Sequence, residues 1–199
     1  RGMKSIIRES YISLKNRIGR IPLLYDFYEQ GEIDPLVIIK EYKTYWQFLE
    51  AVETGKDSCE LNDQEKLILE YLSKTILSGV RPSELCILKE FLDKDTISTS
   101  DVRRELEYEY DYFITDQEVE ESVKVLQGHF VSKDDEYQKY KFMNIVRPDG
   151  ERTMRSVEAY QRCLQNEDFN AQIRDIIKVG LARYKDKYTK GKSEDTPFV

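Results

Sequence analysis

Apolar residues recur at three- and four-residue steps along most of this 199-residue chain, and this periodicity constrains the fold more than any other feature. The first helical stripe is formed by Ile6, Ile7, Tyr11, Leu14 and Ile18. Nine glycines and five prolines are few for this length, which disfavours the many turns of a β-sandwich or barrel. The sequence therefore predicts a mainly α-helical protein.

Residues 1–52 are predicted to form a small N-terminal helical bundle with short connections. Gly19 follows the first stripe and supplies a helix end, because glycine adopts the left-handed conformation without strain. Asp34 followed by Pro35 is a capping residue before a proline at the first helical position, so a new helix is predicted there. A polar stretch, residues 53–60, is predicted to link this bundle to the rest of the chain.

A second helical domain is predicted over residues 61–188. Its helix starts are marked by capping-box patterns at Asn62–Glu65 and Thr115–Glu118, in which side chains satisfy the first free amides of a helix. Residues 189–199 are polar and are predicted to form a disordered tail.

Part of this domain, about residues 82–147, is predicted to be winged-helix-like. Three helical segments are followed by the chain's one β signal, with strands at residues 130–131 and 140–146 joined by a polar turn. The turn residues Pro148-Asp149-Gly150 come after this hairpin. Three helices followed by a hairpin is the order of a winged helix. C-terminal helices are predicted over residues 152–165 and 169–188.

The residue inventory gives no catalytic constellation. His129 is the single histidine, and the three cysteines are far apart, so the paired spacing of a structural zinc site is missing. The sequence contains no glycine-rich phosphate loop, no Gly-x-Ser-x-Gly elbow and no His-x-x-x-His pair. The glutamates at positions 118, 120 and 121 are interpreted as a solvated helix face rather than a metal site. We therefore expect no enzymatic activity and no cofactor in this chain.

Neither a membrane span nor a signal peptide is expected. No apolar run approaches the roughly 18 residues that a spanning helix needs. The N-terminal residues form an amphipathic pattern with interspersed acids, which differs from a secretory signal. These features predict a cytoplasmic protein with reduced cysteines and no membrane contact.

Basic residues beside aromatic residues suggest nucleic-acid contact, since cations bind phosphates and aromatic rings stack on bases. The residues selected on this basis in the N-terminal bundle are Lys15, Arg17, Arg20, Lys43, Tyr45 and Trp46. A second candidate patch, near the Pro148 turn, consists of Arg147, Arg152 and Arg155. Two alternatives stay open: Tyr45 and Trp46 belong to the core, and the second patch pairs with acids of the segment 101–121.

The winged-helix part carries the wrong charge for reading DNA. The whole chain has a net charge of −7, and residues 101–140 hold twelve acids and five bases. The third helix, where a DNA reader presents Arg, Lys, Asn or Gln, begins Thr115-Asp116-Gln117-Glu118-Val119-Glu120-Glu121. Phosphates would repel these carboxylates, so a protein contact is the favoured use of this helix.

Three runs carry a family resemblance: LKNRIGRIPLLYDFY (14–28) with GEIDP (31–35), YKTYWQFL (42–49), and LSGVRPSELCIL (77–88). Together, over residues 8–92, they resemble the region that follows the motor in bacterial superfamily II DEAD/DEAH-box-like helicases. That family often carries a phospholipase-D-like nuclease domain and a C-terminal domain of unknown function. Val80 departs from the family's pattern, in which lysine is usual.

The resemblance implies a parent protein that couples ATP hydrolysis to nucleic-acid translocation. ATP and magnesium are then expected only in the motor domain of the same polypeptide, which would be this chain's partner. Two hypotheses are open. In the first, the chain is a non-catalytic accessory domain that contacts DNA or RNA or positions it for the motor. In the second, it is a structural or protein-interaction module that docks on the motor or another protein without binding nucleic acid. An exposed apolar patch near residues 108–126 would favour the second hypothesis.

Overall fold

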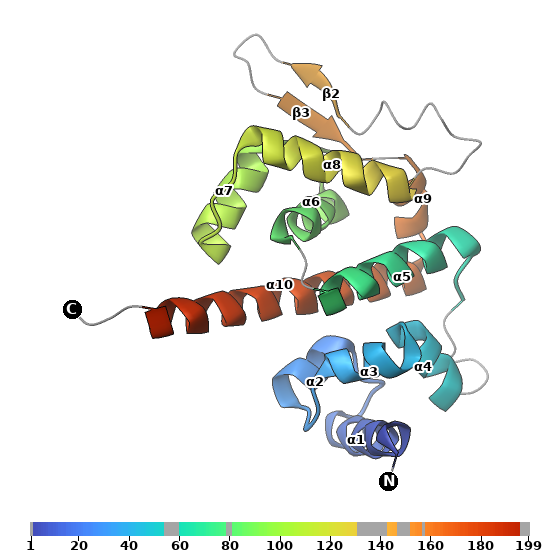
Figure 1. Ribbon diagram of the computed structural model, residues 1–199. Helices are drawn as coiled ribbons and strands as arrows, with labels where there is room; N and C mark the ends of the chain where they lie inside the picture. Colours follow the sequence, from blue (N-terminus) through green and yellow to red (C-terminus); the bar gives the residue numbers. More distant parts are fainter. Residues whose placement is uncertain are drawn as a thin grey trace. The chain divides into compact units, whose positions relative to one another are not determined.

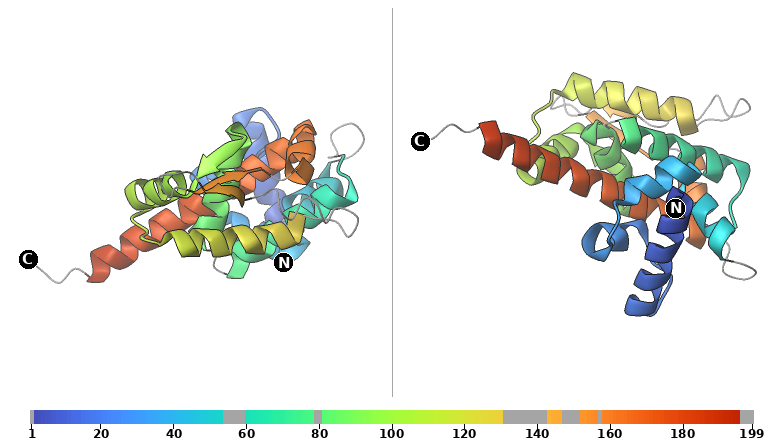
Figure 2. Two further views of the ribbon diagram at one scale, coloured as in Figure 1. Left: turned by 90° about the horizontal axis from the view of Figure 1, so that it is seen from above. Right: turned by 60° about the horizontal axis from the view of Figure 1, so that its bottom comes forward.

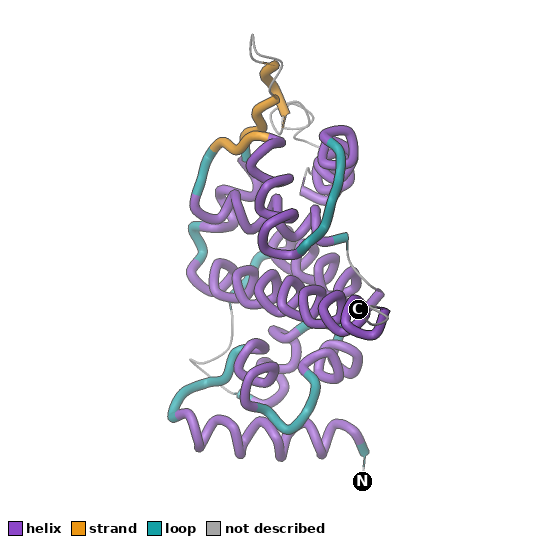
Figure 3. Tube along the Cα trace, turned by 90° about the vertical axis from the view of Figure 1, so that its left-hand side faces the viewer, coloured by secondary structure: helices purple, strands orange, loops and turns teal. Residues whose placement is uncertain are grey.

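The computed structural model describes residues 2–53, 60–78, 81–130, 143–146, 152–156 and 158–195 (Figure 1). Helices dominate, and three short strands form one small sheet within the described part, as the purple and orange segments of Figure 3 show. The predicted mainly α-helical fold is therefore confirmed. In chain order the elements are α1 (Met3–Ile18), α2 (Leu24–Gln30), α3 (Pro35–Tyr42), α4 (Tyr45–Val52), α5 (Asp63–Ser78), α6 (Pro82–Asp93), β1 (Thr96–Ser98), α7 (Thr99–Tyr110), α8 (Asp116–Phe130), β2 (Met143–Val146), β3 (Arg152–Arg155), α9 (Glu158–Leu164) and α10 (Glu167–Asp195).

Contacts divide the chain into two compact units. The N-terminal unit comprises Arg1–Gly79 and Asn166–Val179, and the winged-helix unit comprises Val80–Gln165 and Gly180–Val199. Helix α10 is one continuous helix in both views of Figure 2. Its residues up to Val179 belong to the N-terminal unit, and those from Gly180 belong to the winged-helix unit. Helix α5 packs against α3 in the N-terminal unit, whereas the sequence analysis grouped it with the later helices.

Helix boundaries follow the local capping signals. Gly19 ends α1 with a φ of 76°, in the left-handed region. The Asp34 carboxylate accepts the amide of Leu36 at 3.0 Å at the start of α3. Asn62 and Glu65 each accept the other's amide at 2.8 Å, which completes the predicted capping box. These predictions are confirmed, because each depends on residues no more than four positions apart.

The N-terminal unit is built around an aromatic cluster. The ring of Phe48, which is fully buried, lies 5.1 Å from those of Tyr11 and Tyr42 and 5.7 Å from that of Tyr45. Edge-to-face and offset geometries of this kind add to the gain from burying apolar area. The short helices α2, α3 and α4 are therefore held by the core that they share with α1, since helices of seven or eight residues are marginal in isolation.

The second unit has winged-helix topology. Helices α6, α7 and α8 contact one another, β1 lies between α6 and α7 in the chain, and β2 and β3 follow α8. The strand order is β1-β3-β2, with both pairings antiparallel. The winged-helix-like prediction is confirmed, and the unit extends to β3, beyond residue 147. The buried apolar residues of its helices include Leu85, Leu88, Val102, Leu106, Val119, Val123 and Leu126.

The predicted strand positions need correction. Phe130 is the last residue of α8, and β2 pairs with β3, so residues 152–155 are strand rather than the start of a helix. The predicted turn Pro148-Asp149-Gly150 lies outside the described residues, between these two strands. Strand β1 was not predicted at all. The reason is tertiary: Met154 pairs with Ile97, 57 positions earlier in the chain, and both are buried.

The C-terminal prediction also changes. Helix α10 begins at Glu167 and continues to Asp195, so the segment predicted to be disordered is helical as far as residue 195. No proline interrupts this region before Pro197. Charged, straight-chain residues such as lysine and glutamate sustain a helix well, and the polar composition therefore did not signal a coil.

Candidate functional site

Two of the cations selected from the sequence are held in ion pairs within the N-terminal unit. Lys15 Nζ lies 2.7 Å from a carboxylate oxygen of Glu53, which Tyr11 also contacts. Arg20 forms a two-pronged contact with Asp26 at 2.7 and 2.8 Å. The hydrogen bond from Lys15, followed by that from Tyr11, lowers the pKa of Glu53. Charges that are already paired in this way offer less to a phosphate group.

Asp26 is nearly buried, and burial acts to raise its pKa. The hydrogen bonds from Arg20 and from the Leu23 amide act in the opposite direction and outweigh burial, so the pKa of Asp26 lies below its usual value. Arg17, three positions before Arg20, donates to the backbone oxygen of Gln30 at 2.7 Å. These contacts assign Arg17 and Arg20 a role in fastening α1 to the start and end of α2.

Lys43 joins α3 to α4 in an unusual conformation. Its side chain is exposed, and its φ of 74° with ψ of −45° lies in a region that residues with a side chain rarely adopt. Lys43→Gly is therefore expected to raise the free energy of unfolding by roughly 0.5–1 kcal/mol, because glycine relieves this strain at a modest entropic cost. Lys43→Ala keeps the strain and should leave stability unchanged. Urea unfolding followed by the fluorescence of Trp46, the single tryptophan, measures both; equal effects of the two substitutions would contradict the assignment.

Tyr45 and Trp46 belong to the core. Their exposed fractions are 2% and 6%, and the Tyr45 hydroxyl donates to the backbone oxygen of Pro22. Burial raises the pKa of Tyr45 well above its usual value. Lys66 Nζ lies 5.2 Å from the Trp46 ring centre. Neither ring has an open face on which a base could stack, so the alternative that both residues belong to the core is the one that the structure supports.

The second candidate patch is described only in part. Arg147 lies outside the described residues. Arg152 and Arg155 begin and end β3, and the Arg155 side chain is exposed. Arg152 and Arg155 belong to the winged-helix unit, whereas the cations selected first belong to the N-terminal unit.

Titratable groups do not converge on a reaction centre in the described part of the chain. His129 is exposed near the end of α8, and partial burial lowers its pKa although the charge of Glu84 acts to raise it. Among the described residues, no three or more His, Cys, Asp and Glu side chains are arranged to hold a metal ion. The buried thiol of Cys86 has its pKa raised to about 12 by burial, which disfavours the reactive thiolate.

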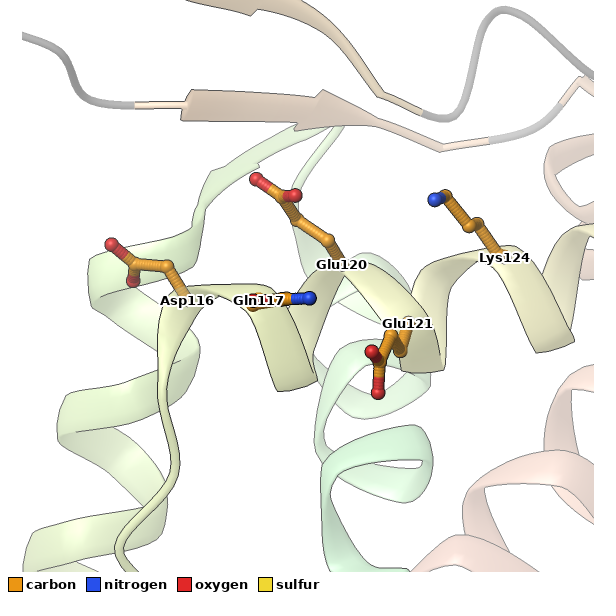
Figure 4. A pocket seen from close by; sticks show the side chains of 5 residues that line it. All are labelled: Asp116, Gln117, Glu120, Glu121 and Lys124. Atoms are coloured by element: carbon orange, nitrogen blue, oxygen red, sulfur yellow. The ribbon is translucent and has the colours of Figure 1, made fainter.

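Helix α8 instead presents an acidic surface in the winged-helix unit. A shallow depression of about 390 Å³ is lined by Asp116, Gln117, Glu120, Glu121 and Lys124. Figure 4 shows Asp116, Glu120 and Lys124 on the side of α8 that faces the strands, with Glu121 on the opposite side. Three of these five side chains are carboxylates on consecutive turns, so the helix at the DNA-reading position carries negative charge along its first half.

Two exposed aromatic side chains lie within residues 108–126, the region where an exposed apolar patch would favour the protein-interaction hypothesis, although the sequence analysis named neither residue. Tyr108, in the last turn of α7, is 79% exposed, and Phe113, in the connection to α8, is 69% exposed. Single exposed apolar residues are ordinary, but two exposed aromatic rings within six positions of an acidic segment make that segment a candidate interaction surface. The alternation of acids and aromatics from Glu107 to Phe113 is the sequence signal that identifies it.

Asp175 is a second residue that sequence reasoning missed, and its role is structural. It lies in α10, is 4% exposed, and accepts the amides of Leu24 and Tyr25 at 2.7 and 3.0 Å. These are the first two helical residues of α2, whose amides have no partner within that helix. A carboxylate 150 positions away thus caps α2. The available signal was an acid inside the apolar stripe formed by Phe169, Ile173, Ile176 and Ile177.

The cap should make stability depend on pH. Burial raises the pKa of Asp175 from 3.8 to about 6, against the lowering effect of its two amide hydrogen bonds. The folded chain then binds this proton more tightly than the unfolded chain, so the contribution is complete below about pH 4 and is lost as pH rises through 6. We expect the stability of the wild type relative to Asp175→Asn to fall by on the order of 3 kcal/mol across this range.

Trp46 fluorescence during urea unfolding at pH 4, 5, 6 and 7 provides the measurement, with Asp63→Asn as the exposed control in the same unit. A stability difference that grows with pH would show that the amide hydrogen bonds dominate and that the carboxylate is favoured as the anion.

No helix among the described residues is both long enough and apolar enough to cross a membrane.

Comparisons with known sequences identify one family. No curated protein sequence matches the chain. A family described as a domain of unknown function, DUF8090, matches residues 7–188, which covers both units. The chain is therefore a member of the DUF8090 family.

Proposed function

We propose that this chain is a non-catalytic accessory module that acts by docking on protein through its winged-helix unit. The observation that carries the proposal is the surface formed by residues 105–121, which we call the α7–α8 surface. It places exposed carboxylates of α8 where a DNA-reading winged helix needs cations, and it exposes Tyr108 and Phe113 in the segment that leads into α8. Phosphates disfavour such a surface, whereas a protein partner can bury the rings.

We further propose that the protein docked on is, or acts with, an ATP-driven helicase of superfamily II. This part rests on the resemblance of residues 8–92 to the region after the motor in such helicases. ATP and magnesium would then be bound by the motor and not by this chain. The DUF8090 family is described without an activity, so membership in it does not support the helicase proposal.

Direct contact with DNA or RNA by the N-terminal unit has weaker support. Lys15 and Arg20 are paired with carboxylates, and Tyr45 and Trp46 are buried. Lys43 and Arg155 stay exposed, but they belong to different units. Of the residues selected in the N-terminal unit, the two aromatic rings are therefore not open to the base stacking that single-strand binding uses.

The test compares the full-length protein with its Tyr108→Ala/Phe113→Ala variant. We expect the variant to lose at least about tenfold in binding of a partner protein or in its effect on the parent's ATPase, since each buried ring contributes on the order of 1.5–3 kcal/mol. Leu67→Ala/Leu77→Ala is the matched control, because these two exposed apolar residues lie on α5. Unchanged partner binding and unchanged ATPase activity in the variant would overturn the proposal.

A further inference from the structure

The two exposed rings of the α7–α8 surface are held in place by the fold. After α7 the chain turns at Asp111, which has a φ of 51°, and the amide of Tyr112 donates to the Leu106 oxygen at 3.0 Å. The Tyr112 ring packs edge-on against Tyr184, with 5.7 Å between ring centres. The neighbouring Phe113 is 69% exposed, so Tyr112 anchors the segment while Phe113 faces solvent.

The segment that carries the rings is strongly acidic. Residues 105–121 contain eight Asp and Glu and no Lys or Arg. Among the described residues, three of these acids form ion pairs with cations outside the segment: Lys89 with Glu105 at 2.5 Å, Arg103 with Asp116 at 2.8 Å, and Lys185 with Glu109 at 4.0 Å. The exposed carboxylates of Glu107, Glu118 and Glu121 have no ion pair with any described residue.

Two of these carboxylates are close to the rings in the chain. Glu107 precedes Tyr108 in the last turn of α7. The amide of Glu118 donates to the hydroxyl of Thr115 at 3.2 Å, two positions after Phe113. Burial, followed by the negative charge of Glu118, also raises the pKa of Tyr112. The Arg103–Asp116 pair also joins the start of α8 to α7. Rings and carboxylates therefore lie in one short stretch of the chain, from the last turn of α7 to the first turn of α8.

We infer that the α7–α8 surface binds an arginine-rich protein segment, with guanidinium groups lying on Tyr108 and Phe113 and bonded to Glu107 and Glu118. This inference rests on the proposed docking function and names the chemistry of its partner. A guanidinium stacks on an aromatic face and donates to a carboxylate at the same time, which suits a ring flanked by acids. A lysine ammonium is more strongly hydrated and lacks the flat face, so arginine should be preferred over lysine.

Other occupants fit less well. Nucleic acids and anionic lipid surfaces bring phosphates to a surface that already carries uncompensated negative charge. A divalent cation would need converging carboxylates, and the described residues contain no such group. An uncharged apolar segment would cover the rings but would desolvate the carboxylates beside them without replacing their hydrogen bonds.

The experiment titrates the chain with a capped peptide of alternating arginine and alanine and records fluorescence anisotropy and backbone NMR shifts. Peptides of the same length with lysine or glutamate in place of arginine are run in parallel. We expect the arginine peptide to bind, the lysine peptide to bind several-fold more weakly, and the glutamate peptide not to bind. NMR shifts should map to residues 105–121.

Variants separate the contributions of rings and charges. Tyr108→Ala/Phe113→Ala should weaken arginine-peptide binding about tenfold and remove the preference over lysine. Glu107→Gln/Glu118→Gln should weaken binding and reduce its salt dependence. The matched controls, Leu67→Ala/Leu77→Ala for apolar area and Glu29→Gln/Glu50→Gln for charge, lie on the N-terminal unit and should bind as the wild type does.

The outcomes distinguish this inference from the proposed function. If the ring variant loses its protein partner in the full-length protein but the arginine peptide binds wild type and variant equally, or binds neither, the arginine inference is wrong and docking stands. Equal binding of arginine and lysine peptides would likewise overturn it, since a diffuse acidic surface makes no such distinction. If the peptide binds as expected but the Tyr108→Ala/Phe113→Ala variant keeps normal partner binding and ATPase activity, the proposed function is wrong instead.

Discussion

Replacing Phe48 with alanine is expected to lower the free energy of unfolding of the N-terminal unit by about 3–5 kcal/mol. Phe48 is fully buried and contacts the rings of Tyr11, Tyr42 and Tyr45, so its removal opens a cavity that three rigid side chains cannot easily fill. The effect is large because these residues come from α1, α3 and α4, so the cluster packs three helices against one another.

Urea unfolding followed by Trp46 fluorescence measures this change, since Trp46 lies two positions away in the same helix. Phe48→Leu is the informative control. It retains most of the apolar volume and should cost less than half as much as the alanine substitution. A loss below about 1 kcal/mol for Phe48→Ala would contradict the central position of this ring in the core.

Replacing Tyr160 with alanine is expected to destabilise the winged-helix unit by a similar amount, about 3–5 kcal/mol. Tyr160 in α9 is among the largest fully buried side chains of the chain. Its hydroxyl donates to the backbone oxygen of Leu88 in α6 at 3.0 Å, inside the unit's core. The substitution removes both the ring volume and the donor for a buried carbonyl oxygen.

Tyr160→Phe separates these two contributions. It keeps the ring and removes the hydroxyl, and it should cost about 1 kcal/mol, the typical net value of one hydrogen bond. Hydrogen exchange of the amides of α6 and α7 measures the stability of this unit directly, without relying on Trp46 in the other unit. Equal losses for the phenylalanine and alanine variants would show that the ring is not packed as described.

The features that the sequence predicted correctly are local in the chain. The Asp34–Pro35 start of α3 and the Asn62–Glu65 capping box each involve neighbouring residues, and the chemistry that selects them operates within one helical turn. The three-helix part of the winged helix was predictable for the same reason, because α6 and α8 each carry a strong apolar periodicity.

The features that sequence analysis missed depend on contacts between distant positions. Strand β1 has three residues and is a strand only because β3 pairs with it. The cap on α2 comes from Asp175, which no local pattern around Leu24 reveals. In the same way, Tyr45 and Trp46 have the composition of a stacking surface, but both are buried, and Tyr45 packs against Phe48 and bonds to Pro22.

The candidate site illustrates the same division. The acidic character of residues 115–122 is legible in the sequence, and it led to the expectation of a protein contact there. The alternation of acids and aromatics marks this segment, but it does not predict that Tyr108 and Phe113 are exposed, because aromatic residues at helical spacing are more often part of the core. The anchoring of Tyr112 against Tyr184 decides which ring of the Tyr112–Phe113 pair turns outward, and the two tyrosines are 72 positions apart.

The central claim is that the α7–α8 surface contacts protein and not nucleic acid, and photo-crosslinking from position 113 tests it most directly. A benzophenone amino acid replaces Phe113 in the full-length protein, and the same residue at position 67 on α5 serves as the control. The account predicts adducts from position 113 that are sensitive to protease and resistant to nuclease, and in which the crosslinked partner peptide is rich in arginine. Adducts from position 113 that nuclease removes would contradict it.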